Sequence, residues 1–161
     1  MIKQHMKKVA ISVYMVLTIV SFIYTLGFFT NFLQIRSADA ELYKAMQAFN
    51  QLIFRGSIAL ILGMVVMYAT EVHKTESNGI FTKAVSVING LGGLGFSYYL
   101  LTMIPEFKER YLAINLEDIQ IYFEKYTLNT LTFELGTLFA YIFAVASILL
   151  ILGVFVKNTE D

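Results

Sequence analysis

The sequence predicts an all-α, polytopic membrane protein in which four helices cross the bilayer and form one domain over residues 1–161. Two observations carry this prediction. First, 57% of the residues are hydrophobic and only 15% are charged, whereas a soluble domain carries about 25% charged residues. Second, four separate stretches are apolar over the length that a bilayer requires. They hold more than half of the chain, so too little sequence is left for a separate water-soluble catalytic module.

Each predicted span meets the length of a transmembrane helix. That length is about 20 apolar residues, because the hydrocarbon layer is about 30 Å thick and a helix rises about 1.5 Å per residue. Backbone polar groups in lipid must be satisfied within their own segment, which forces these stretches to be helical. The third span is expected to close at Pro105, the single proline of the chain. The spans cover residues 9–35, 52–70, 84–104 and 131–156.

The distribution of lysine predicts that both termini lie in the cytoplasm. The N-terminal tail carries Lys3, Lys7 and Lys8 with no acidic residue, and the first helix usually dominates topology under the positive-inside rule. With four spans, the C-terminal tail and the inner connection, which contains the turn signal Asn78-Gly79, share that side. We therefore expect two in–out–in hairpins in a plasma membrane. The absence of cysteine is compatible with a bacterial one.

The two outer loops, residues 36–51 and 105–130, predict short amphipathic helices. In the first loop, apolar residues recur at helical spacing after Ser37 or Asp39, either of which can cap a helix. The helix of the second span is therefore expected to begin outside the membrane. In the second loop, Asn115 can cap a helix whose apolar stripe runs on to Tyr126. Such a stripe needs an apolar partner, either the bilayer surface or the outer mouth of the bundle.

Arg55 and Glu134 are the charged residues inside the four predicted spans. A charge at the bilayer centre costs roughly 2.5–3.5 kcal/mol on insertion scales, so such residues usually face the bundle or a wet cavity. Both lie about one turn inside the outer end of their span, and so at similar depth. Two interpretations stand. The residues form an ion pair between the second and fourth spans, or each side chain snorkels separately to the outer interface.

A run of glycines distinguishes the third span. Small residues at helical spacing allow another helix to approach closely. Alternatively, the helix unwinds here and exposes its backbone to a ligand or ion, as in discontinuous transporter helices. A nucleotide-binding loop is rejected, because that motif follows a strand and opens a helix in a βαβ unit. The residues of this candidate face are Ser86, Asn89, Gly90, Gly92, Gly93, Gly95 and Ser97.

Aromatic residues gather toward the outer half of the predicted bundle. They fit either the ordinary aromatic belt of a membrane protein or an apolar pocket for a lipid-like or aromatic molecule beneath the second outer loop. The candidate pocket residues are Tyr98, Tyr99, Tyr122, Phe123 and Tyr126.

The composition argues against most catalytic and nucleic-acid chemistry. Twelve basic and twelve acidic residues give no net charge, and so no basic field for nucleic acid. Without cysteine there is no thiolate metal site and no cysteine nucleophile. The two histidines, His5 and His73, both fall on the inner side, and no set of nucleophile, base and orienting group is visible. We expect no catalytic residues, no metal site, no cofactor and no bound nucleotide.

Three functions remain open. The leading prediction is a non-enzymatic subunit or interaction partner of a larger membrane complex, in a hetero- or homo-oligomer surrounded by lipid. The first alternative is a small oligomeric transporter or channel with a polar path near Arg55, Glu134 and Asn89. The second alternative is a lipid-binding or lipid-sensing protein that uses the outer aromatic residues.

Overall fold

The computed structural model describes residues 2–72 and 79–155, and every regular element in this part of the chain is a helix. His73 and Asn78 lie outside the described residues, as does the side chain of His5. Four described helices are long and apolar enough to cross a membrane, which confirms the predicted all-α polytopic fold. The elements are α1 (Ile2–Asn31), the 3-10 helix η1 (Leu33–Ser37), α2 (Ala40–Val72), α3 (Gly79–Leu112), α4 (Leu116–Gln120) and α5 (Leu131–Phe155).

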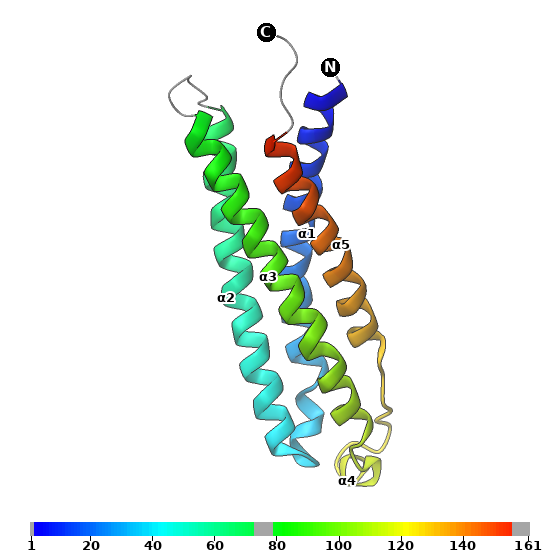
Figure 1. The fold of residues 1–161 in the computed structure, drawn as a ribbon. Helices are drawn as coiled ribbons and strands as arrows, with labels where there is room; N and C mark the ends of the chain where they lie inside the picture. Colours follow the sequence, from blue (N-terminus) through cyan, green and yellow to red (C-terminus); the bar gives the residue numbers. More distant parts are fainter. Residues whose placement is uncertain (1, 73–78, 156–161) are drawn as a thin grey trace.

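The four long helices run antiparallel to their neighbours in one bundle (Figure 1). The helix α1 packs against α2 and α5, and α3 packs against the same two helices. As a result, α2 and α5 lie on diagonally opposite sides of the bundle. The start of α1 and the end of α5 lie at one end, and η1 and α4 lie at the other (Figure 1).

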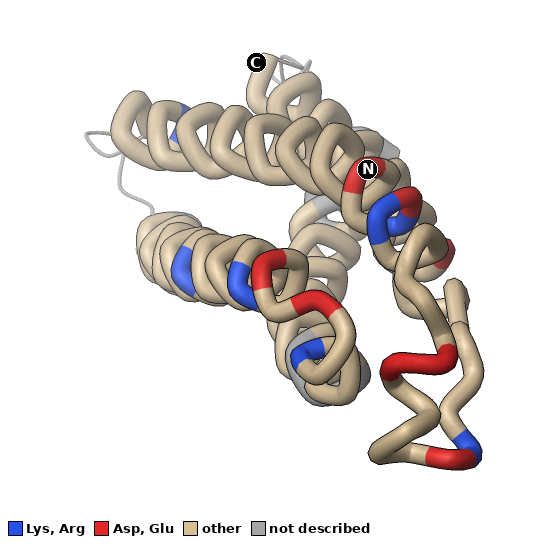
Figure 2. The backbone as a smooth tube through the Cα atoms, turned by 90° about the horizontal axis from the view of Figure 1, so that it is seen from below, with Lys and Arg blue, Asp and Glu red and all other residues tan. Residues whose placement is uncertain are grey.

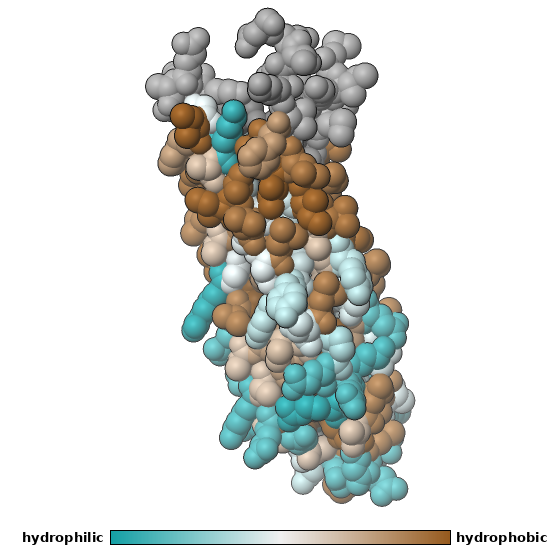
Figure 3. Space-filling model, viewed as in Figure 1, coloured by the Kyte–Doolittle hydropathy of each residue, from teal (hydrophilic) through white to brown (hydrophobic). Residues whose placement is uncertain are grey.

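The helices α2 and α3 are longer than a bilayer requires. They contain 33 and 34 residues, which corresponds to about 50 Å against a hydrocarbon layer of about 30 Å. Most of the excess lies at the end that carries η1 and α4. Charged residues gather at this end (Figure 2), and its visible surface is hydrophilic, whereas the opposite half is hydrophobic (Figure 3). We call this polar end the cap and define it as residues 33–51 and 105–130.

Pro105 does not end its helix, in contrast to the expectation from sequence. Proline removes a backbone donor and its ring clashes with the carbonyl four residues earlier, which favours a kink or a stop. Nevertheless α3 continues to Leu112. Its neighbours Ile104 and Phe107 are both buried, so packing on each side of the proline holds the helix. The consequence is that residues 106–112, expected in a loop, belong to the bundle.

Asp39 caps the start of α2. Its Oδ1 accepts a hydrogen bond of 2.8 Å from the backbone N–H of Leu42, so of the two candidate caps Asp39 fills the role and Ser37 does not. Ser37 instead donates to the carbonyl of Gln34. The helix α2 begins at Ala40 within the cap, well before residue 52, where the predicted apolar stretch begins.

Asn115 caps α4, as predicted, by accepting a hydrogen bond of 3.2 Å from the backbone N–H of Glu117. The helix is much shorter than the apolar stripe predicted, because it ends at Gln120 and the chain to residue 130 consists of turns and coil. Two consecutive aromatic residues follow Ile121, and such residues favour helix less than Ala or Leu. The Gln120 side chain then donates to the carbonyl of Tyr126 and stabilises the non-helical path.

The core has two apolar clusters with a polar layer between them. The buried face of α1 shows the sequence of layers: Tyr14 belongs to one cluster and Phe28 to the other. Between them lie Thr18, Ser21 and Thr25, each of which is buried and donates to the carbonyl four residues earlier. This back-bonding satisfies the hydroxyl groups within the helix itself.

Candidate functional site

Arg55 and Glu134 do not pair, so of the two interpretations of these residues the ion pair is not formed. Glu134 Oε1 lies 3.3 Å from Nζ of Lys108 on α3 and accepts a hydrogen bond of 2.9 Å from Thr130. Arg55 lies on α2, diagonally across the bundle from α5, and has no ion-pair or hydrogen-bond partner among the described residues. Sequence reasoning missed Lys108 because it assigned the residues after Pro105 to a loop.

The ion pair that does form is on the surface. The side chains of Lys108 and Glu134 are 35% and 56% exposed. An exposed pair contributes little to stability, because water and salt screen it. The pair therefore links the end of α3 to the start of α5 at the surface, and it is not a buried charged site.

The glycine face of α3 is used inside the bundle, against α5 and α1. A Cβ atom added at Gly90 would lie 2.5 Å from Cγ1 of Ile151, and one at Gly93 would lie 2.8 Å from Oη of Tyr14. Both distances are too short for an ordinary contact, so only glycine allows this close approach. Of the two interpretations of the glycine run, helix packing fits, and the unwound helix does not, because α3 is unbroken from Gly79 to Leu112.

The other members of this face divide between the core and the surface. Ser86, Asn89 and Ser97 are buried inside the bundle. Gly92 instead faces α2, where a Cβ atom would lie 3.3 Å from Leu60, and Gly95 has nothing within 4 Å. The small residues therefore lie on more than one face of α3. Their spacing in the sequence does not show which helix each of them contacts.

A polar contact between α1 and α3 was not foreseen. Tyr14 Oη donates a hydrogen bond of 2.7 Å to the backbone carbonyl of Asn89, and the Tyr14 ring stacks on Phe143 with a centroid distance of 5.1 Å. The available signal was periodicity, since Tyr14 heads the row of hydroxyl side chains that continues through Thr18. The partner across the bundle, 75 residues away, carries no signal in the sequence.

Three buried polar atoms in the transmembrane core have no partner among the described residues. They are Ser57 Oγ, Ser97 Oγ and Asn89 Nδ2. None of the three groups is ionisable, and no Lys, Arg, Asp or Glu is among the buried residues of the described chain. Among the described residues, the core therefore contains isolated polar groups and no buried charged side chain.

The candidate outer aromatic pocket, one of the two interpretations of the aromatic residues, is not assembled. Tyr98 and Tyr122 are 71% and 70% exposed, and Phe123 is 45% exposed. Tyr99 is half-buried against Phe49, with ring centroids 5.5 Å apart. The five residues therefore do not surround one cavity, because the chain after Gln120 leaves the helical path that would have aligned them.

Tyr126 is bound into the cap by a small hydrogen-bond network. Its hydroxyl lies 2.9 Å from the hydroxyl of Tyr111, which also accepts from the backbone N–H of Asn129 at 3.1 Å. Burial, together with the contact to Tyr111, raises the pKa of Tyr126 above its usual value. The network ties the loop before α5 to the end of α3.

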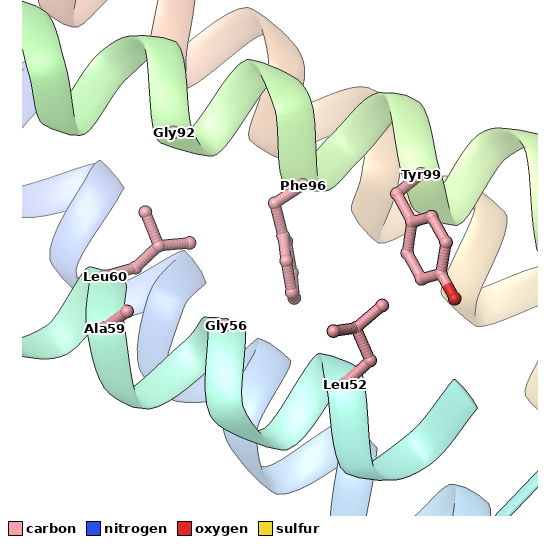
Figure 4. A pocket seen from close by; sticks show the side chains of 7 residues that line it. All are labelled: Leu52, Gly56, Ala59, Leu60, Gly92, Phe96 and Tyr99. Atoms are coloured by element: carbon pink, nitrogen blue, oxygen red, sulfur yellow. The ribbon is translucent and has the colours of Figure 1, made fainter. Parts of the chain in front are cut away.

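A groove open to the surface lies between α2 and α3 (Figure 4). Its volume is about 320 Å³, and the Tyr99 hydroxyl is the one side-chain polar group of its lining. The small residues Gly56 and Ala59 on α2 and Gly92 on α3 lie along the groove. The Phe96 ring extends from α3 into the space between the two helices (Figure 4). Two residues singled out from the sequence, Gly92 and Tyr99, belong to it. The lining residues are Leu52, Gly56, Ala59, Leu60, Gly92, Phe96 and Tyr99.

The fold and surface define a small four-helix polytopic membrane protein with an apolar belt and a polar cap. Comparison with protein-family models, with curated proteins and with solved structures gives no match to this chain. Within residues 2–72 and 79–155, no three His, Asp or Glu side chains are grouped as metal ligands would be. Function is therefore inferred from the surface of the chain itself.

Proposed function

We propose that this chain is a non-enzymatic subunit or interaction partner of a larger membrane complex, and that it contacts its partner through the cap. The observation that carries the proposal is an exposed apolar segment directly after α4. Ile121, Tyr122 and Phe123 are consecutive, and they are 72%, 70% and 45% exposed. Contiguous apolar residues on a water-facing surface mark interaction sites.

The position of this segment favours a protein partner over the bilayer surface. The third apolar stretch ends at residue 104, and α3 continues to Leu112, about 12 Å further. The headgroup layer beyond the hydrocarbon is only about 5–8 Å thick on each side. Because α4 lies at the far end of the cap (Figure 1), we place residues 121–123, which we call the apolar tip, beyond the lipid headgroups, where they require another partner.

The transporter alternative receives less support. It requires a polar path near Arg55, Glu134 and Asn89. Arg55 and Glu134 are exposed and Asn89 is buried, and the first two lie on helices that are not neighbours. One copy of the chain therefore does not bring these groups onto a common path.

A serine triple variant of Ile121, Tyr122 and Phe123 is expected to lose its partner while the bundle stays folded. Truncation of apolar anchors at an interface costs more than about 1 kcal/mol per anchor, so we expect at least a tenfold weaker association. The measurement is stoichiometric co-purification after mild solubilisation, together with photocrosslinking from position 122 in native membranes. A matched serine triple of the exposed polar residues Asp118, Glu124 and Lys125 keeps the partner.

Two results would contradict this proposal. The apolar triple variant could retain the stoichiometric partner, or the wild-type chain could give no discrete crosslinked product from position 122. Circular dichroism and thermal melting of each variant separate loss of binding from loss of fold, because the exposed side chains contribute little to the core.

We also propose that the cap faces the extracytoplasmic side of a plasma membrane. The start of α1, whose sequence carries three lysines and no acid, lies at the opposite end of the bundle (Figure 1). Lysine-rich tails stay in the cytoplasm. Since the natural chain has no cysteine, single cysteines can report accessibility without background.

Labelling of single cysteines in intact cells tests this orientation. A membrane-impermeant maleimide is expected to label Asp118→Cys in the cap directly, and to label Lys83→Cys at the start of α3 only after the membrane is permeabilised. Both positions are exposed on the folded chain, so differences in labelling report sidedness. The reverse pattern would place the cap in the cytoplasm.

A further inference from the structure

Arg55 lies at the edge of the α2–α3 groove. Leu52, Arg55 and Ala59 recur at intervals of three and four residues and therefore share one face of α2. Leu52 and Ala59 line the groove, and Arg55 is exposed beside them. Its guanidinium has no partner among the described residues. An exposed cation thus borders an apolar groove.

The depth of the groove matches one leaflet of the bilayer. The second apolar stretch begins at residue 52, and the groove extends from Leu52 to Leu60, a distance of about 12 Å along the helix. A leaflet contributes about 15 Å of hydrocarbon. Arg55 is about 5 Å inside the cap-side boundary, so its apolar stem can run outward and place the guanidinium at the level of the lipid phosphates.

We propose that this groove and Arg55 bind one phospholipid with an anionic headgroup, taken from the leaflet on the cap side. The guanidinium pairs with the lipid phosphate, because its planar fork matches phosphate oxygens bidentately. One acyl chain lies along the groove across the Phe96 ring, which packs against Gly56. The Tyr99 hydroxyl, at the Leu52 end of the groove (Figure 4), donates to a headgroup oxygen.

Charge and surroundings select this occupant. An unpaired arginine at the hydrocarbon boundary is costly, and an anion at phosphate level offsets that cost. The groove walls are apolar and leave no polar group for a peptide backbone, apart from the hydroxyl at the mouth. This site is separate from the apolar tip of the cap, so lipid binding here does not depend on whether the proposed partner binds there.

Native mass spectrometry of the full chain in detergent tests the site. The probes are phosphatidylglycerol and phosphatidylcholine with identical acyl chains. We expect phosphatidylglycerol to bind about tenfold more tightly. Both lipids carry the phosphate, but the cationic choline of phosphatidylcholine repels the guanidinium and cancels the negative charge of the headgroup. Arg55→Gln should abolish that preference and Arg55→Lys should restore part of it, because lysine keeps the charge and loses the fork.

Filling the groove tests the acyl-chain contact. Ala59 is exposed on the groove wall, so Ala59→Phe should occupy the groove without disturbing the core, and it should weaken binding of both lipids about tenfold. Gly95→Leu is the matched control, because it adds an apolar side chain to α3 at a position with nothing within 4 Å and outside the groove. It should leave lipid binding unchanged.

Three results overturn the proposal. The two lipids could bind wild type equally, or Arg55→Gln and Ala59→Phe could both bind phosphatidylglycerol like wild type. A third overturning result is a dimer of the chain that Ala59→Phe dissociates, since a second copy would then occupy the groove. Thermal melting of each variant confirms that the bundle being compared is folded.

Discussion

Replacing Gly93 with leucine is expected to destabilise the bundle by about 3 kcal/mol or more, the upper range for overpacking a close-packed core. A Cβ atom at Gly93 would lie 2.8 Å from Tyr14 Oη and would also overlap with Ser147 Oγ. Neither neighbour can move freely. Tyr14 is hydrogen-bonded to the carbonyl of Asn89, and Ser147 donates to the carbonyl of Phe143. The leucine therefore forces α3 away from α1 and α5.

Gly95→Leu is the matched comparison, two residues further along the same helix. Its position is open, and leucine favours helix over glycine by roughly 0.5–1 kcal/mol, so we expect unchanged or slightly higher stability. Thermal unfolding in detergent, followed by circular dichroism, measures both variants. Equal melting temperatures for the two variants would show that the close approach at Gly93 is not needed for the fold.

Phe133→Ala is expected to cost about 3–5 kcal/mol, the usual range for truncating a fully buried phenylalanine. Phe133 is 0% exposed. Its ring contacts Phe28, Phe32 and Tyr111, with centroid distances of 5.7, 4.9 and 5.4 Å. These contacts join the start of α5 to α1 and α3 at the base of the cap, so the cavity left by alanine loosens three helices at once.

A second phenylalanine on the same helix provides the control. Phe155 is 71% exposed at the other end of α5, so Phe155→Ala should change the free energy of unfolding by no more than about 0.5 kcal/mol. Denaturation of the two variants in the same detergent gives the comparison. If Phe133→Ala were as stable as Phe155→Ala, the aromatic cluster would contribute little to the bundle.

Features of the fold that depend on local chemistry could be predicted from the sequence. Apolar length identified the four helices that can span a membrane. Asp39 and Asn115 cap their helices because each bonds a backbone group two or three residues away. In these cases the interacting groups are close in sequence, so one segment contains the complete signal.

Contacts between helices could not be predicted in the same way. The partner of Glu134 proved to be Lys108, and the tyrosine at position 14 bonds to Asn89. Both contacts depend on which helices are neighbours and on their relative register, which a single sequence does not specify. Pro105 added a specific error, because its local preference to end a helix is overcome by the burial of Ile104 and Phe107.

The groove illustrates the same limit. Gly92 was recognised as small, and Tyr99 as aromatic, but neither property says that they face Leu52 and Gly56 on another helix. Arg55 was recognised as a charge inside the second predicted span, and only the bundle shows that it lies beside residues that line an apolar groove. The properties of individual residues were therefore accessible, whereas the surfaces that they form together were not.

The unbroken passage of α2 and α3 into the cap has a mechanical consequence. From residue 52 to its start at Ala40, α2 extends about 18 Å past the apolar boundary. Because no linker separates the membrane-spanning part of α2 from its part in the cap, any tilt of the bundle also tilts the cap. Transmembrane helices lean by about 20° on average and adjust to bilayer thickness, and such a lean displaces an 18 Å lever arm sideways by about 6 Å. Thinning or thickening of the lipid would thus shift the cap sideways.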